Sequence, residues 1–240
     1  GPDHSTLSGM VFAKDDEDPN HRLSRQQIID NALLLILAGS ETSAQTLTNA
    51  ILLLGMHRHT WHRLVREQAD MCEQSGDVLT REALDKECPY LDAVVREVLR
   101  LKPLGVALPR LAKGTVIVDG NQIPKGWGVQ YSIRLTHEQD AKTYLKDGSH
   151  MDIQRGFSPE RWLNKERRPC TDFIPYGIGP RHCLGMTLAY TEMKVFLAIL
   201  ARRIDFQLAE EPEQIRWKKI GLVPRVEGGL PIFGKCRNSA

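Results

Sequence analysis

A single cysteine, Cys183, lies in a glycine-rich stretch, Tyr176-Gly-Ile-Gly-Pro-Arg-His-Cys-Leu-Gly185, that leads into an apolar run with helical spacing. The start of a helix offers free backbone N–H groups and a positive dipole end, which stabilise a negatively charged sulfur. Arg181 offers a planar cation to a carboxylate. Three glycines allow the backbone to approach a flat ligand closely: Gly177, Gly179 and Gly185. The stretch predicts a loop that presents a thiolate to a metal and suits haem; the alternative is a buried structural cysteine beside a glycine turn.

An acid and an alcohol, Glu41 and Thr42, lie in the middle of a long apolar helical pattern. Packing explains such a pair poorly, because a buried carboxylate needs a partner. A polar pair in the middle of such a helix therefore indicates a functional role. The alternative is a Thr42 hydroxyl bonded back to a helical carbonyl, with Glu41 solvated.

Two opposite charges, Glu97 and Arg100, are three residues apart in a helical pattern, so their side chains share one face. Taken alone, this spacing predicts a solvated surface pair that contributes little to stability.

These residues together resemble the cytochrome P450 family. The cysteine stretch matches the family's signature Phe-x-x-Gly-x-Arg-x-Cys-x-Gly except at its first position, where Tyr176 replaces Phe. Three further motifs follow the family's order: Ala38-Gly-Ser-Glu-Thr-Ser43, Glu97-Val-Leu-Arg100 and Phe157-Ser-Pro-Glu-Arg-Trp162. Ile123-Pro-Lys-Gly-Trp127, Tyr131-Ser-Ile-Arg134 and His137 are most similar to the group of retinoic acid, sterol and plant hormone hydroxylases.

The resemblance implies a haem b cofactor (iron protoporphyrin IX) and assigns roles to these residues. Cys183 would be the iron ligand, and Tyr176 would lie near the thiolate. Arg181 and Arg110 would contact the haem propionates; the alternative is that both are ordinary surface arginines. Ala38 and Gly39 would leave room for oxygen beside Glu41 and Thr42, which would deliver protons. The remaining assignments are a buried structural network, Glu97, Arg100 and Arg161, and a substrate pocket lined by Val106, Ala107 and Leu108.

The implied function is a monooxygenase that uses O2 and electrons from a reductase or ferredoxin to oxidise an apolar small molecule, such as a lipid, sterol, retinoid or terpenoid. The alternatives are a haem-thiolate isomerase or peroxygenase, or a truncated, non-catalytic module that depends on assembly. The resemblance covers only the family's C-terminal part, so we expect a homodimer or association with the missing N-terminal part, because uncovered apolar surface drives association.

The elements that must position these residues are mainly α-helices with small antiparallel β-sheets, the C-terminal part of the cytochrome P450 fold. Ser24 and Gln27 predict a capping box that opens a long, buried, central helix to about Gly55. Thr60 and Thr80 predict two helix caps, and Pro89 the start of a helix ending near Leu101. The remaining predictions are a hairpin at Asp119-Gly120, a polar surface loop over residues 144–155, one helix after Cys183, and a final β region.

Length and composition predict a folded chain that can bury a sizeable core. The chain has 240 residues, 41% of them hydrophobic, and a formal net charge of +2. It contains no basic stripe for nucleic acid and no long uncharged run that predicts a membrane span. Five irregularly spaced cysteines favour an intracellular setting, at the endoplasmic reticulum membrane for an anchored eukaryotic member and otherwise in the cytoplasm. We interpret residues 1–20 as a cleavage scar and flexible linker, and residues 21–240 as the haem-binding portion.

Overall fold

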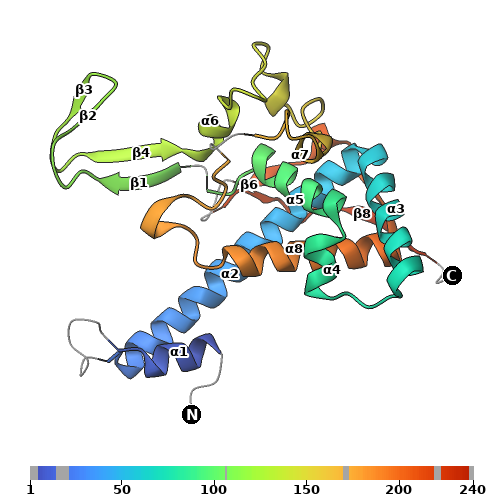
Figure 1. Cartoon of the computed structure of the whole chain (residues 1–240), viewed down its shortest axis with the longest axis horizontal. Helices are drawn as coiled ribbons and strands as arrows, with labels where there is room; N and C mark the ends of the chain where they lie inside the picture. Colours follow the sequence, from blue (N-terminus) through green and yellow to red (C-terminus); the bar gives the residue numbers. More distant parts are fainter. Residues whose placement is uncertain (1–4, 15–21, 106, 170–172, 219–222, 238–240) are drawn as a thin grey trace. The chain divides into compact units, whose positions relative to one another are not determined.

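The computed structural model describes residues 5–14, 22–105, 107–169, 173–218 and 223–237. Its elements are mainly helices, with short antiparallel strand pairs (Figure 1), which confirms the predicted fold class. The chain divides into two compact units, Gly1–Thr42 and Ser43–Ala240.

The first unit contains helix α1 (Thr6–Phe12), inside the segment interpreted as a linker, and the first part of helix α2 (Arg25–Met56). The predicted capping box is present: the Ser24 N–H donates to Gln27 Oε1 at 2.8 Å, and the Gln27 N–H to Ser24 Oγ at 3.2 Å. The five apolar residues 33–37 are 37% to 69% exposed. The expectation of a fully buried helix is therefore wrong for this part of α2, because none of the described residues of the first unit is buried.

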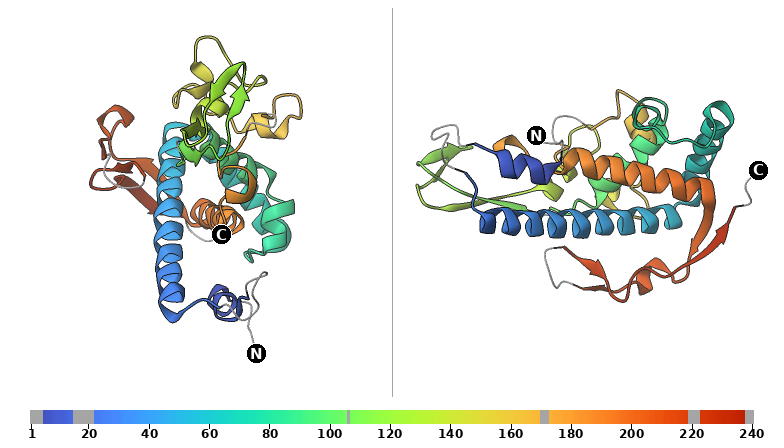
Figure 2. Two further views of the ribbon diagram at one scale, coloured as in Figure 1. Left: turned by 90° about the vertical axis from the view of Figure 1, so that its left-hand side faces the viewer. Right: turned by 90° about the horizontal axis from the view of Figure 1, so that it is seen from below.

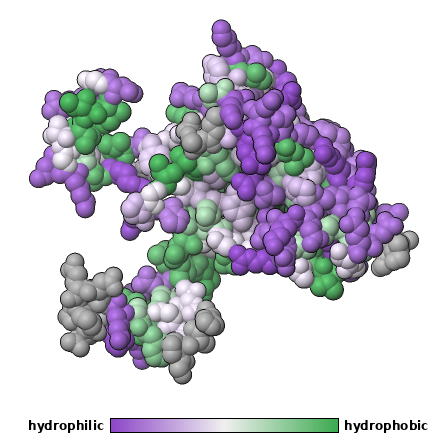
Figure 3. Space-filling view, in the orientation of Figure 1, coloured by the Kyte–Doolittle hydropathy of each residue, from purple (hydrophilic) through white to green (hydrophobic). Residues whose placement is uncertain are grey.

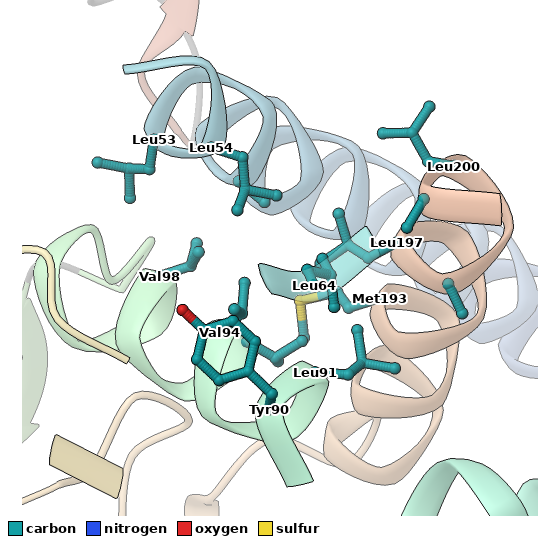
Figure 4. Packing of buried hydrophobic residues seen from close by; sticks show 14 of the residues in the cluster. Leu53, Leu54, Leu64, Tyr90, Leu91, Val94, Val98, Met193, Leu197 and Leu200 are labelled. Carbon is teal, nitrogen blue, oxygen red and sulfur yellow. The ribbon is translucent and has the colours of Figure 1, made fainter. Parts of the chain in front are cut away.

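From Gln45 onwards, α2 contributes buried side chains to the hydrophobic core of the second unit. Figure 4 shows these side chains beside those of α3 (Arg58–Ser75), α5 (Pro89–Leu101) and α8 (Met186–Arg203). Residues at the centre are at most 1% exposed: Leu53, Leu54, Leu64, Leu91, Val94 and Leu197. Because full burial of one such side chain stabilises the fold by about 1.5–3 kcal/mol, this cluster fixes the helices that carry much of the candidate site.

Local signals set most helix starts. Helix α4 (Arg81–Lys86) begins after Thr80, whose hydroxyl accepts from the Ala83 N–H at 3.1 Å, as predicted. The prediction of a cap at Thr60 is wrong: α3 begins at Arg58, and Thr60 is fully buried within it.

Helix α5 runs from Pro89 to Leu101, as predicted. Its first N–H groups are satisfied from α3, because the Glu67 carboxylate accepts from the N–H groups of Tyr90 at 2.6 Å and Leu91 at 2.9 Å.

Two antiparallel strand pairs follow α5. Strand β1 (Ala107–Leu111) pairs with β4 (Gly128–Ser132), and β2 (Val116–Val118) pairs with β3 (Asn121–Ile123). Asp119 and Gly120 form the predicted turn, with φ angles of 48° and 77°. The hairpin carries exposed apolar side chains, including Ile117, and shows as a partly green lobe in Figure 3.

The segment between β4 and the cysteine loop contains α6 (Ile133–Glu138), η1 (Ser149–Met151) and α7 (Glu160–Leu163). The prediction of a polar surface loop over residues 144–155 is wrong in part, because His150 and Met151 are buried. The His150 ring ties this segment together: Nδ1 accepts from the Leu145 N–H at 3.1 Å, and Nε2 lies 2.7 Å from the Glu138 carbonyl oxygen.

After the cysteine loop, α8 continues directly into β5 (Ile204–Leu208), which pairs with the last strand, β8 (Ile232–Cys236) (Figure 2). Between them lie η3 (Pro212–Gln214) and the pair of β6 (Trp217–Lys218) with β7 (Arg225–Val226). The predicted helix and final β region are thus present. Among the described helices, we find none with the length and apolar character needed to span a membrane.

Candidate functional site

The cysteine loop turns tightly before α8. Gly177 and Gly179 have φ angles of 76° and 72°, a backbone conformation that glycine adopts without strain. The Cys183 N–H donates to the Tyr176 carbonyl at 2.9 Å and closes the loop, which includes η2 (Gly179–Arg181). Cys183 is an exposed free thiol just before Gly185, the residue that precedes α8. The loop therefore presents its sulfur outward at a helix start, and a side chain at Gly179 or Gly185 would meet no heavy atom within 4 Å.

Tyr176, which replaces the Phe of the family signature, is half-buried at the start of this loop. Its ring packs against that of Tyr190 on α8, with centroids 5.3 Å apart. Burial raises the pKa of the Tyr176 phenol, and the nearby Tyr190 and Cys183 raise it further. The phenol therefore stays protonated near neutral pH.

A buried carboxylate, Glu97, joins α5 to α7. Its Oε1 accepts from Arg100 Nη2 and Arg161 Nε at 2.9 Å each and from the Ser158 N–H at 3.0 Å. Its Oε2 accepts from Arg100 Nε and Trp162 Nε1, also at 2.9 Å each. Sequence spacing alone predicted a surface pair here, but Glu97 is 0% exposed and Arg100 1% exposed. The structure brings the three residues of the resemblance-based network together, and adds Ser158 and Trp162.

Arg100 also binds the backbone of the segment before α7. Its Nη2 donates to the carbonyl oxygens of His150 at 2.8 Å and Gly156 at 3.1 Å, and Arg161 Nη2 reaches the same Gly156 oxygen at 3.1 Å. These bonds fix the backbone at His150 and Gly156. Backbone acceptors have no residue signature, so sequence patterns could not reveal them.

His137 connects this network to the cysteine loop. The Ile174 N–H donates to His137 Nε2 at 3.0 Å, and His137 Nδ1 lies 3.1 Å from the Arg100 carbonyl oxygen. Because Nε2 accepts, Nδ1 must carry the proton and donate to Arg100. The ring also stacks on Phe173, with centroids 5.3 Å apart. His137 therefore fixes the backbone two residues before Tyr176.

We expect replacement of His137 by phenylalanine to lower the free energy of unfolding by about 1–3 kcal/mol, because the stacking on Phe173 is kept while a buried N–H and a carbonyl lose their partner. Hydrogen exchange at the Ile174 amide should become faster. His137→Gln, which can both accept and donate, is the matched control and should restore much of the protection. Unchanged Ile174 exchange in the phenylalanine variant would refute this role.

Arg181 and Arg110, the two arginines expected to contact the haem propionates, are far apart in the sequence. Arg181 is exposed within η2. Arg110 lies on β1, where its Nη1 donates to the Pro109 carbonyl at 2.9 Å and its guanidinium lies 5.5 Å from the Tyr131 ring centroid. Val106 is outside the described residues, and Ala107 and Leu108 are described as part of the β1 backbone.

The acid and alcohol candidates lie on the first part of α2, in the first unit. The Thr42 hydroxyl donates to the Ala38 carbonyl at 2.7 Å, as the alternative interpretation expected, whereas Glu41 is half-buried rather than fully solvated. A side chain at Gly39 would meet no heavy atom within 4 Å, so the glycine leaves open space on this helix.

Comparisons with known proteins agree with this geometry. The family model "Cytochrome P450" matches residues 3–228. Cytochrome P450 monooxygenase poxC of Penicillium oxalicum is 35% identical over 218 residues, covering 86% of this chain and 43% of that protein. Putative cytochrome P450 120 of Synechocystis is 37% identical over 208 residues, covering 86% of this chain and 45% of that protein.

A solved structure, retinoic acid-bound cyanobacterial CYP120A1, superposes with a TM-score of 0.83 at 33% identity, covering 99% of this chain and 52% of that one. The chain therefore spans less than half the length of these two curated relatives and about half of the solved structure.

Proposed function

The chain belongs to the cytochrome P450 family, and from this premise we propose that it is the C-terminal, haem-thiolate part of a monooxygenase. The observation that carries the proposal is the loop that presents the Cys183 thiol at the start of α8. The Glu97 network and His137 support it, because they fix the backbone that leads into that loop.

The donors of the loop fit a haem. Cys183 is an exposed free thiol, and a haem iron, which is held mainly by its macrocycle, can take a single thiolate from the protein. The open space above Gly179 and Gly185 suits a flat group. A haem iron with a thiolate ligand supplies oxygen activation, because the sulfur donates electron density that favours O–O cleavage.

The other candidate residues would serve this chemistry by binding and by moving protons. Arg181 and Arg110 would pair with the haem propionates as charged hydrogen-bond donors. Glu41 and Thr42 would pass protons, which requires the Thr42 hydroxyl to leave the Ala38 carbonyl during the reaction. Ala38 and Gly39 would leave room for oxygen, and residues 106–108 would line the substrate pocket.

We further propose an apolar substrate of the lipid, sterol, retinoid or terpenoid kind, and a reductase or ferredoxin as electron donor. Support for a retinoid-like substrate comes from the match to a solved relative with retinoic acid bound.

A second candidate function, an assembly-dependent module, is favoured by a different observation. Residues 33–37 of α2 form an exposed apolar run, which favours association with a second copy or with a further N-terminal part.

The test is the absorbance spectrum of the purified chain loaded with haem, reduced and exposed to carbon monoxide. We expect a strongly red-shifted Soret band that disappears in Cys183→Ala and persists in Cys236→Ala, which removes another exposed thiol. The same band in both variants would exclude Cys183 as the ligand. No haem uptake by the chain alone would favour the assembly-dependent module.

A further inference from the structure

A partly enclosed cavity of about 260 Å³ lies where α5 ends, beside β6. Its lining includes Leu101, Met151 and Trp217, and its polar side chains are Asn49, Lys102 and Arg134. Leu101 and Met151 are buried, so the apolar part of the lining belongs to the fixed core. The volume is slightly below the range of drug-sized pockets, which begins at about 300 Å³, and suits a smaller molecule.

Two positive charges line this cavity together. Lys102 follows the last residue of α5, and its Nζ lies 4.1 Å from the Trp217 ring centroid. Arg134 lies in the first turn of α6. Within the part of the chain that the structure describes, no Asp or Glu forms an ion pair with either side chain. Burial lowers the pKa of Lys102, and the charge of Arg134 lowers it further.

The Trp217 ring explains only part of this arrangement. An aromatic face attracts the Lys102 ammonium, but it does not neutralise the repulsion between Lys102 and Arg134. Lys102 is half-buried and Arg134 is exposed, and like charges that line one cavity disfavour each other. An anion bound between the two side chains would offset this repulsion, because an opposite charge favours the charged form of each cation.

We propose that this cavity binds the carboxylate of a small molecule whose apolar part lies against Trp217, Leu101 and Met151. The Arg134 guanidinium matches a carboxylate by paired hydrogen bonds, and Lys102 adds a second charged donor. The apolar lining accepts a short hydrocarbon and distinguishes this ligand from inorganic anions. The site does not depend on the proposed haem chemistry, because none of these residues lies on the cysteine loop.

Calorimetric titration with sodium hexanoate tests the site directly, with hexanol and inorganic phosphate as the matched probes. We expect hexanoate to bind at least about 10-fold more tightly than either probe, because only hexanoate offers both a charge and an apolar part. Hexanoate should also raise Tm. Equal binding of hexanol would overturn the role of the two cations, and equal binding of phosphate would overturn the apolar part of the site.

Three variants separate binding from structure. Lys102→Met keeps an apolar stem of similar length, and we expect about 10-fold weaker hexanoate binding together with a higher Tm without ligand, because a repelled cation is removed. Lys102→Arg should retain binding, and Lys113→Met, at an exposed lysine of the hairpin connection, should change neither quantity. A lower Tm with unchanged hexanoate affinity in Lys102→Met would show that the lysine is structural and would refute the proposal.

Discussion

Replacing Glu97 with glutamine is expected to lower the free energy of unfolding by about 3–5 kcal/mol, the cost of leaving buried charges without their partner. Both Arg100 and Arg161 depend on this carboxylate, and each binds it at 2.9 Å. A typical domain has a total stability of about 5–15 kcal/mol, so the variant should be partly or wholly unfolded at moderate temperature. Any loss of haem binding would then follow from unfolding.

Urea unfolding monitored by circular dichroism measures this effect. Glu82→Gln is the matched control, because it makes the same chemical change in an exposed i, i+4 pair with Lys86, where the expected change is within about 0.5 kcal/mol. If both variants lost the same small amount of stability, the Glu97 network would not be a main support of this fold.

The Glu97 carboxylate also makes the free energy of unfolding depend on pH in the acidic range. Burial alone would raise the pKa of Glu97, but Arg100, Arg161 and the Ser158 N–H outweigh burial and lower it. A depressed native pKa contributes stability that is fully present above the unfolded value of about 4.3 and is lost as pH falls through the lower native value. The difference in stability between the wild type and Glu97→Gln should therefore narrow below about pH 4.

Replacing Gly156 with alanine should also be severely destabilising, by about 3 kcal/mol or more. A Cβ at this position would lie 2.5 Å from the His150 carbonyl oxygen and 2.6 Å from that of Ser149. These are backbone atoms, so they cannot rotate away as a side chain would. Any shift of the segment would also disturb the Gly156 oxygen that accepts from Arg100 and Arg161 at 3.1 Å each.

Gly128→Ala is the control, because a side chain there would meet nothing within 4 Å. Its Tm should stay close to that of the wild type, whereas Gly156→Ala should unfold at a clearly lower temperature. A Gly156→Ala chain with the wild-type Tm would mean that residues 149–156 are not held as tightly as these contacts require.

Local chemistry in the sequence predicted the elements that depend on few neighbours. Thr80, Pro89 and the pair Asp119-Gly120 each satisfy a backbone requirement within a few residues. Thr60 has the same hydroxyl as Thr80, yet it lies inside α3, because that helix begins at Arg58 with His57 as its N-cap. Packing against other parts of the chain therefore decides which of two similar threonines begins a helix. Residue spacing carries no information about that packing.

Some parts of the candidate site could be predicted from the sequence alone, and others could not. The cysteine loop carries its own glycines, so the residue pattern was sufficient to expect its tight turn. The burial of Glu97 was expected only through the family resemblance, since its partners Ser158, Arg161 and Trp162 lie 61 to 65 residues away. The expected burial of residues 33–37 was wrong, because an apolar helix pattern indicates a need for burial and does not supply the covering surface. Uncovered apolar surface was expected only from the family resemblance, which covers the family's C-terminal part.

The guanidinium of Arg100 recognises the path of the main chain at residues 150 and 156 rather than the side chains found there. A guest peptide, epitope tag or protease site inserted between these two carbonyls would change the spacing that Arg100 must span. For engineering, this short stretch constrains the number of residues as well as the identity of Gly156. The exposed turn at Asp119-Gly120 joins β2 to β3, which pair with each other, and it offers the safer place for an insertion.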